Sequence, residues 1–185
     1  MPLRLSHGLE SARLLTRLVT EDDLPALLVV NGDDAVTHYL PYASWRSLED
    51  ARNWYARMGA LQAAGAALQF AVLEKQSGVA IGSCLLFRHD EASARAELGY
   101  VLGRTHWGQG YMQEALRTLI ECAFGELNLR RLEAEVDPRN TRSSQLLLRL
   151  GFTVEGRLRE RWLTKGELTD VSVCGLLSRE WRRPG

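Results

Sequence analysis

Two glycines separated by one residue stand directly before an amphipathic segment, in Trp107-Gly108-Gln109-Gly110-Tyr111-Met112. The first-turn N–H groups of a helix have no partner inside the helix, and the aligned peptide dipoles place partial positive charge there. Because glycine has no Cβ, a phosphate can approach such a backbone closely. The spacing therefore predicts an anion-binding loop, although a glycine pair at a strand-helix junction also suits simple turn geometry.

The residues after these glycines exclude two common phosphate loops. A nucleoside-triphosphate loop requires Gly-Lys-Ser/Thr, whereas Tyr111 and Met112 follow Gly110. A dinucleotide fingerprint requires a third glycine, and Gln113 occupies that position. The anion expected at this loop is therefore of another kind.

A second helix start follows the turn Asp137-Pro138-Arg139. Asn140 and Ser143 lie near the expected N-terminus of this helix, where both residue types commonly act as caps. Parallel strands that carry Tyr100 and Val136 would bring both helix starts to one edge of a sheet, which is where α/β proteins usually bind ligands. Capping and ligand binding are both open for this pair.

The pattern of apolar residues predicts one mixed α/β domain without repeats or a linker. Apolar side chains recur every three or four residues after Ser47 and after Gly110, which is the helical period. We expect a strand, two helices, three strands, a helix, a strand, a helix and two strands, over about residues 13–19, 24–32, 48–61, 68–74, 79–87, 94–102, 110–127, 131–136, 141–150, 152–163 and 170–177.

Length and composition limit the classes of protein. A chain of 185 residues is long enough for one buried core and short for two. The 23 basic and 23 acidic side chains balance, which argues against a nucleic-acid partner. Cys84, Cys122 and Cys174 are far apart and lack a Cys/His cluster, so we expect buried thiols and neither a disulfide framework nor a metal site. Neither a signal peptide nor a membrane span is apparent, so we expect a cytoplasmic protein without a membrane partner.

Five short motifs in this order are similar to the GCN5-related N-acetyltransferase (GNAT) superfamily, and most of all to its RimJ/RimL-like branch of ribosomal-protein N-acetyltransferases. The motifs are Glu97-Leu98-Gly99-Tyr100, Trp107-Gly108-Gln109-Gly110-Tyr111, Glu114-Ala115, Asn140-Thr141-Arg142-Ser143 and Leu150-Gly151-Phe152, and the tail Gly166…Asp170…Glu180-Trp181 is similar too. The resemblance implies an α/β acyl-CoA N-acyltransferase fold with a mixed sheet and splayed central strands. The domain would cover residues 13–181, with terminal extensions at 1–12 and 182–185.

The resemblance also implies that acetyl-CoA is the co-substrate and that no metal takes part. The pantetheine arm would lie along the splayed strand, at Tyr100, Val101 and Leu102. The pyrophosphate would lie over the glycine loop, at Trp107, Gly108, Gln109, Gly110, Tyr111 and Met112. Asn140 and Ser143 would border the thioester.

Two positions differ from the usual pattern of the superfamily. Thr105 stands three residues before the first glycine, where Gln or Arg is common. Leu147 stands where many members carry the tyrosine that protonates the departing thiolate. Ser143 or a bound water would have to take over that role.

Transfer of an acyl group from a thioester to an amine needs a base for the amine, a donor for the oxyanion and a proton for the thiolate. The N–H of Val101 or Leu102 could hold the oxyanion. Glu97 or Glu135 could accept the ammonium proton, directly or through water. Related N-terminal acetyltransferases use a glutamate at the second place, which favours Glu135. The other interpretation makes both glutamates solvated strand residues.

We therefore expect an acetyl-CoA-dependent N-acetyltransferase in which a primary amine attacks the thioester directly with general-base assistance. The acceptor would be the N-terminal α-amine of a protein, such as a ribosomal protein, or a small amine. The chain would act as a monomer or a homodimer. The alternative is a non-catalytic acyl-CoA-binding sensor, because Leu147 replaces the tyrosine.

Overall fold

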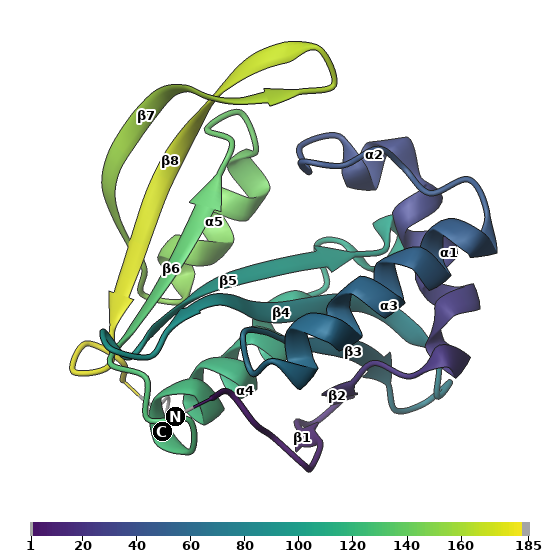
Figure 1. Cartoon of the computed structure of the whole chain (residues 1–185), viewed down its shortest axis with the longest axis horizontal. Helices are drawn as coiled ribbons and strands as arrows, with labels where there is room; N and C mark the ends of the chain where they lie inside the picture. The colour runs from purple at the N-terminus through teal and green to yellow at the C-terminus, as the bar shows by residue number, and fades with distance from the viewer. Residues whose placement is uncertain (1, 183–185) are drawn as a thin grey trace.

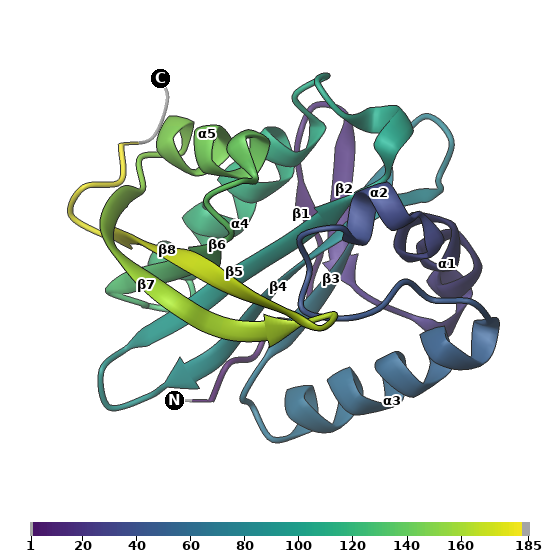
Figure 2. The same cartoon turned by 90° about the horizontal axis from the view of Figure 1, so that it is seen from above.

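An eight-stranded mixed sheet carries helices on both faces (Figures 1 and 2). The structure is a computed structural model that describes residues 2–182, so residues 183–185 of the expected C-terminal extension lie outside it. The strand order is β1-β2-β3-β4-β5-β6-β8-β7, and β5 and β6 form a parallel pair whereas the other neighbours are antiparallel. The expected mixed α/β fold class is confirmed.

The elements follow the predicted order. The strands are β1 (Leu9–Glu10), β2 (Leu14–Leu18), β3 (Leu68–Glu74), β4 (Ala80–Asp90), β5 (Arg95–Leu102), β6 (Arg131–Val136), β7 (Thr153–Thr164) and β8 (Glu167–Leu177). The α-helices are α1 (Leu24–Gly32), α2 (Asp34–Thr37), α3 (Leu48–Ala63), α4 (Tyr111–Gly125) and α5 (Thr141–Arg149). The prediction missed β1 and α2, because segments this short show no period.

Two apolar clusters fix the helices on the sheet. The larger one packs α4 and α5 on one face, and its fully buried residues include Phe70, Leu86, Leu116, Leu119, Ile120, Leu132 and Leu147. The smaller one packs α1 and α3 on the opposite face of β3 and β4. Figure 2 shows these two layers on either side of the strands.

The apolar face of α3 is only partly buried. Of the apolar residues of α3, Ala51 alone is fully buried. Trp54 and Met58 instead line a cavity between α3 and the sheet. The period of α3 is helical as predicted, but part of its apolar face borders open space rather than core.

The N-terminal segment also contributes to the core. Leu3 and Leu9, which the sequence places in an extension, are 2% and 8% exposed and join the larger cluster. All three cysteines are free and buried, as expected. Among the described residues, no helix combines the length and the apolar character that a membrane crossing requires.

A partly buried ion pair joins β2 to the start of α1. The two terminal guanidinium nitrogens of Arg17, Nη1 and Nη2, donate to the carboxylate of Asp23 at 2.8 and 2.9 Å, and the N–H of Thr20 donates to it at 2.8 Å. Burial alone would raise the pKa of Asp23, but these hydrogen bonds outweigh it and hold the pKa below its ordinary value. The charged form of Asp23 therefore stabilises the fold.

Asp23→Asn should lower the free energy of unfolding by about 2 kcal/mol at neutral pH, because it removes the charge-assisted hydrogen bonds from the partly exposed Arg17. The depressed pKa makes this contribution present above about pH 3.9, the value for a free aspartate, and lost as the pH falls through the folded-state pKa. Urea denaturation of both proteins at neutral pH and at about pH 3 measures the difference. An equal difference at both pH values would contradict this assignment.

Candidate active site

The two parallel strands separate halfway along their length. Their register covers Arg95↔Arg131, Ala96↔Leu132 and Glu97↔Glu133 and then stops, although β5 continues to Leu102 and β6 to Val136. Beyond this point a cavity of about 670 Å³ opens, lined by both strands, α5, the α2 region and the β7–β8 hairpin. We call the diverging part of β5 and β6, from residue 98 and residue 134 onward, the splay.

Every second residue of β5 turns its backbone N–H and C=O groups toward the splay. Gly103 donates its N–H to Ile81 of β4 at 2.8 Å, and the carbonyl of Val101 lies against Gly82, also on β4. Alternation therefore turns the backbone groups of Tyr100 and Leu102 toward the splay. Of the two expected oxyanion donors, the N–H of Leu102 is available, whereas that of Val101 points to β4.

The glycine loop leaves a row of backbone N–H groups free. Gly108 and Gly110 have φ values of 75° and 80°, and Gly110 is the residue that caps α4. Within residues 2–182, the N–H groups from Gly108 to Gln113 have no hydrogen-bond acceptor. Among the loop residues, the Met112 side chain is buried in the core, so Met112 offers a ligand its N–H rather than its side chain. The loop has the geometry that the sequence predicts for an anion site.

Neighbouring side chains fix the shape of this loop. Arg13 donates to the carbonyl of Gln109 at 3.0 Å, contacts Glu114 at 2.7 Å and lies 4.2 Å from the centre of the Tyr111 ring. The indole N–H of Trp107 donates to the carbonyl of Leu102 at 2.8 Å. This hydrogen bond between Trp107 and Leu102 joins the loop directly to the splayed strand.

The start of α5 brings the hydroxyl of Ser143 next to the hydroxyl of Tyr100 on β5. The side-chain oxygen of Asn140 accepts the N–H of Ser143 at 3.1 Å, so Asn140 is an N-cap as expected. The hydroxyls of Tyr100 and Ser143 are 2.6 Å apart. Burial raises the pKa of Tyr100 to about 12, so its phenol stays protonated at neutral pH. Leu147, one turn further on, is 1% exposed and belongs to the core.

Both candidate glutamates face the cavity from the other side of the sheet. Glu97 is 9% exposed and accepts a 2.8 Å hydrogen bond from Arg88. Glu135 accepts the indole N–H of Trp162 at 3.0 Å and lies 3.7 Å from the same Arg88 nitrogen. Burial raises the pKa of Glu97, and Arg88 offsets part of this rise. Neither glutamate is a solvated strand residue.

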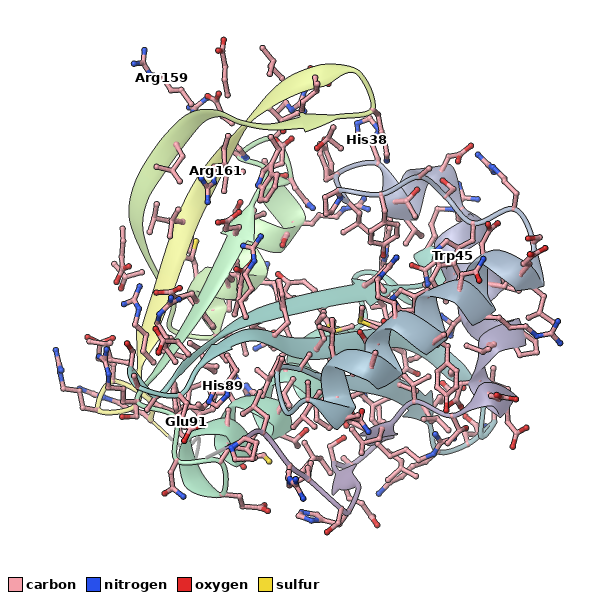
Figure 3. The ribbon with its side chains drawn as sticks, in the orientation of Figure 1. His38, Trp45, His89, Glu91, Arg159 and Arg161 are labelled. Atoms are coloured by element: carbon pink, nitrogen blue, oxygen red, sulfur yellow. The ribbon has the colours of Figure 1, made fainter. Side chains whose placement is uncertain are left out.

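The hairpin closes the cavity against α2. The ammonium of Lys165, at the hairpin turn, donates to the carbonyl of Thr37 at 2.7 Å, and Glu167 pairs with Arg139 at 2.8 Å. In Figure 3, His38 lies beside the hairpin tip, whereas Arg159 of β7 points away from the molecule. Sequence reasoning missed Arg88 and the contact of Trp162, because neither belongs to a motif and both reach Glu135 across the sheet.

Comparisons with known proteins agree on one family. Residues 13–153 match the model of the acetyltransferase (GNAT) domain. The uncharacterized N-acetyltransferase p20 of Bacillus licheniformis is 38% identical over 94% of this chain and 97% of its own length. The ribosomal protein uS5-alanine N-acetyltransferase of Escherichia coli is 29% identical over 94% of this chain and 92% of its own.

A solved structure shares the fold. The spermidine N-acetyltransferase of Vibrio cholerae, in complex with CoA and spermine, superposes with a TM-score of 0.81 at 22% identity, over 92% of this chain and 98% of that one. At this identity the likeness concerns the fold alone. The matched domain and the relatives lead to one conclusion: this chain belongs to the GNAT family and is an acetyltransferase that acts on amines.

Proposed function

We propose that this enzyme acetylates the N-terminal α-amine of a peptide or protein, with Glu135 as the general base and Ser143 as the acid for the thiolate. The observation that carries the proposal is the splay, where free backbone groups, a hydroxyl pair and two carboxylates border one cavity. These are the three kinds of group that acyl transfer to an amine requires.

The donor half of the site uses backbone more than side chains. The free N–H groups of the glycine loop and the partial charge of the α4 N-terminus suit the pyrophosphate of acetyl-CoA. The splayed edge at Tyr100 and Leu102 suits the amides of the pantetheine arm, and Val101 lines the cavity beside them. Asn140 would border the thioester through the turn that it caps.

The proton-transfer groups lie on opposite faces of β5. Tyr100 meets Ser143 on the α5 side, while Glu97 lies on the other side with Glu135. Glu135, with 18% of its side chain exposed, is more accessible than Glu97, with 11%. An arriving ammonium would reach Glu135 first, directly or through a water, and the Ser143 hydroxyl would protonate the thiolate with Tyr100 behind it.

Charge pairing in the cavity favours a peptide N-terminus over a polyamine. Asp137 and Glu167 are both paired with Arg139, and Asp170 is paired with Arg157. A polyamine needs several carboxylates that can each take an ammonium, whereas a peptide N-terminus carries one charge followed by neutral amides. The uS5-alanine acetyltransferase among the relatives supports the same acceptor class. Turnover with N-terminal peptides and with spermidine compares the two directly.

Gly110→Ala should weaken acetyl-CoA binding by about tenfold, because a Cβ on the left-handed cap strains the loop and crowds its N–H groups. The strain itself should cost about 1–2 kcal/mol of stability. Gly125→Ala is the matched control, since Gly125 ends the same helix with open space around it and without a positive φ. Calorimetric titration with acetyl-CoA gives both affinities. Equal affinities for the two variants would contradict a phosphate site at this loop.

Glu135→Gln should reduce kcat by about a hundredfold at neutral pH while leaving acetyl-CoA affinity unchanged, because the amide cannot take the ammonium proton. The control is Glu133→Gln, on the same strand and face, where Glu133 pairs with Arg95 and Arg131. Release of free thiol with a peptide acceptor measures the rates. Unchanged turnover in the Glu135→Gln variant would show that Glu135 is not the general base and would assign that role to Glu97. If the unaltered protein bound CoA but released no thiol, it would be a sensor rather than an enzyme.

A further inference from the structure

The side chain of Arg88 faces the side of β4 opposite to the one that regular alternation predicts. In β4, Cys84 and Leu86 face the α4/α5 core, while Leu85 and Phe87 line the cavity. Simple alternation would place Arg88 with Cys84 and Leu86. Instead Arg88 lines the cavity and lies 5.5 Å from the centre of the Phe87 ring.

A local break in the strand produces this placement. The register between β4 and β5 shifts between Phe87 and Asp90, and Arg88 has a φ of 48°. A positive φ is unfavourable for a residue with a Cβ, and such residues concentrate at functional sites. β-bulges beside active sites commonly redirect one side chain. Here the redirected side chain is a cation.

The redirected guanidinium meets both carboxylates of the site. One nitrogen of Arg88 lies 2.8 Å from Glu97 and 3.7 Å from Glu135. The same guanidinium lies 5.6 Å from the centre of the Trp162 ring, whose N–H holds the other oxygen of Glu135. A cation shared by two carboxylates reduces the repulsion between their charges, and the pKa of Glu97 is raised by the charge of Glu135 and lowered by that of Arg88.

We propose that Arg88 is a positioning residue that offsets the charge repulsion between Glu97 and Glu135, and so extends general-base catalysis to lower pH. The inference rests on the proposed role of Glu135. It assigns a function to a residue that belongs to neither the splay nor the glycine loop.

The other charges around this pair come from several elements. Arg161 of β7 lies 3.9 Å from Glu135, and Glu133 of β6 adds negative charge near Glu97. Arg57 of α3, His38 after α2, Asp137 directly after β6, and Asp170 of β8 also line the cavity. Arg88 differs from these groups because it contacts both Glu97 and Glu135.

The test compares pH profiles of kcat/KM, with acetyl-CoA and a peptide amine, for the unaltered enzyme and four variants. Arg88→Met and Arg88→Gln remove the charge and should move the acidic limb upward by about one pH unit. Arg88→Lys should restore most of the original profile. Arg95→Met is the control, because Arg95 forms similar ion pairs with Asp90 and Glu133 on the same sheet. Its acidic limb should not move.

A second readout does not depend on turnover. Carbon-13 NMR of glutamate-labelled protein should show the titration midpoint of Glu97 rising by about one unit in both charge-removing variants. An unmoved midpoint and an unmoved acidic limb in the folded Arg88→Gln variant would overturn the inference. If Glu135 is not the base, Glu135→Gln keeps its turnover, and the Glu97 midpoint still decides whether Arg88 controls the charge of the pair.

Discussion

The early end of the hydrogen-bonded register between β5 and β6 is the constraint on which the site depends. Each strand stays paired on its outer side, β5 with β4 as far as Leu102 and β6 with β8 as far as Val136. The divergence therefore costs only the few ladder bonds between the two strands themselves. Backbone groups freed in this way need partners, and the amides of a pantetheine arm can supply them. In the proposed mode of binding, the pantetheine arm would occupy the gap where the pairing of β5 and β6 stops (Figure 1).

The pleat of β5 separates the hydroxyl pair from the carboxylates that are proposed to exchange protons with the substrates. Successive side chains point to opposite faces, so Tyr100 reaches Ser143 on α5 while Glu97 points to the other side of the sheet. A thioester lying along the strand would have hydroxyl donors on one side and carboxylates on the other. The buried Leu147 shows that α5 uses its next turn for core packing, which leaves Ser143 as the hydroxyl of that helix at the splay.

Local sequence signals predicted the parts of the site that depend on short-range physics. The helix starts after Gly110 and after Asn140 were predicted from sequence, because the first turn of a helix has strict backbone requirements. The alternation of β5 places Glu97 on the face opposite Tyr100. Arg88 could not be predicted, since regular alternation assigns it to the other face and only a bulge reverses that. The contact between Trp162 and Glu135 depends on a hairpin docking across the sheet, which no local pattern encodes.

Hydrogen exchange of backbone amides, with and without CoA, tests most directly whether the splay and the glycine loop form the acyl-donor site. CoA should protect the amides of Tyr100 and Leu102 together with those from Gly108 to Met112. The amides of Leu68–Glu74 in β3, which is paired on both sides, should change little. If CoA protected amides elsewhere and left those of the splay and the loop unchanged, these two segments would not form the acyl-donor site.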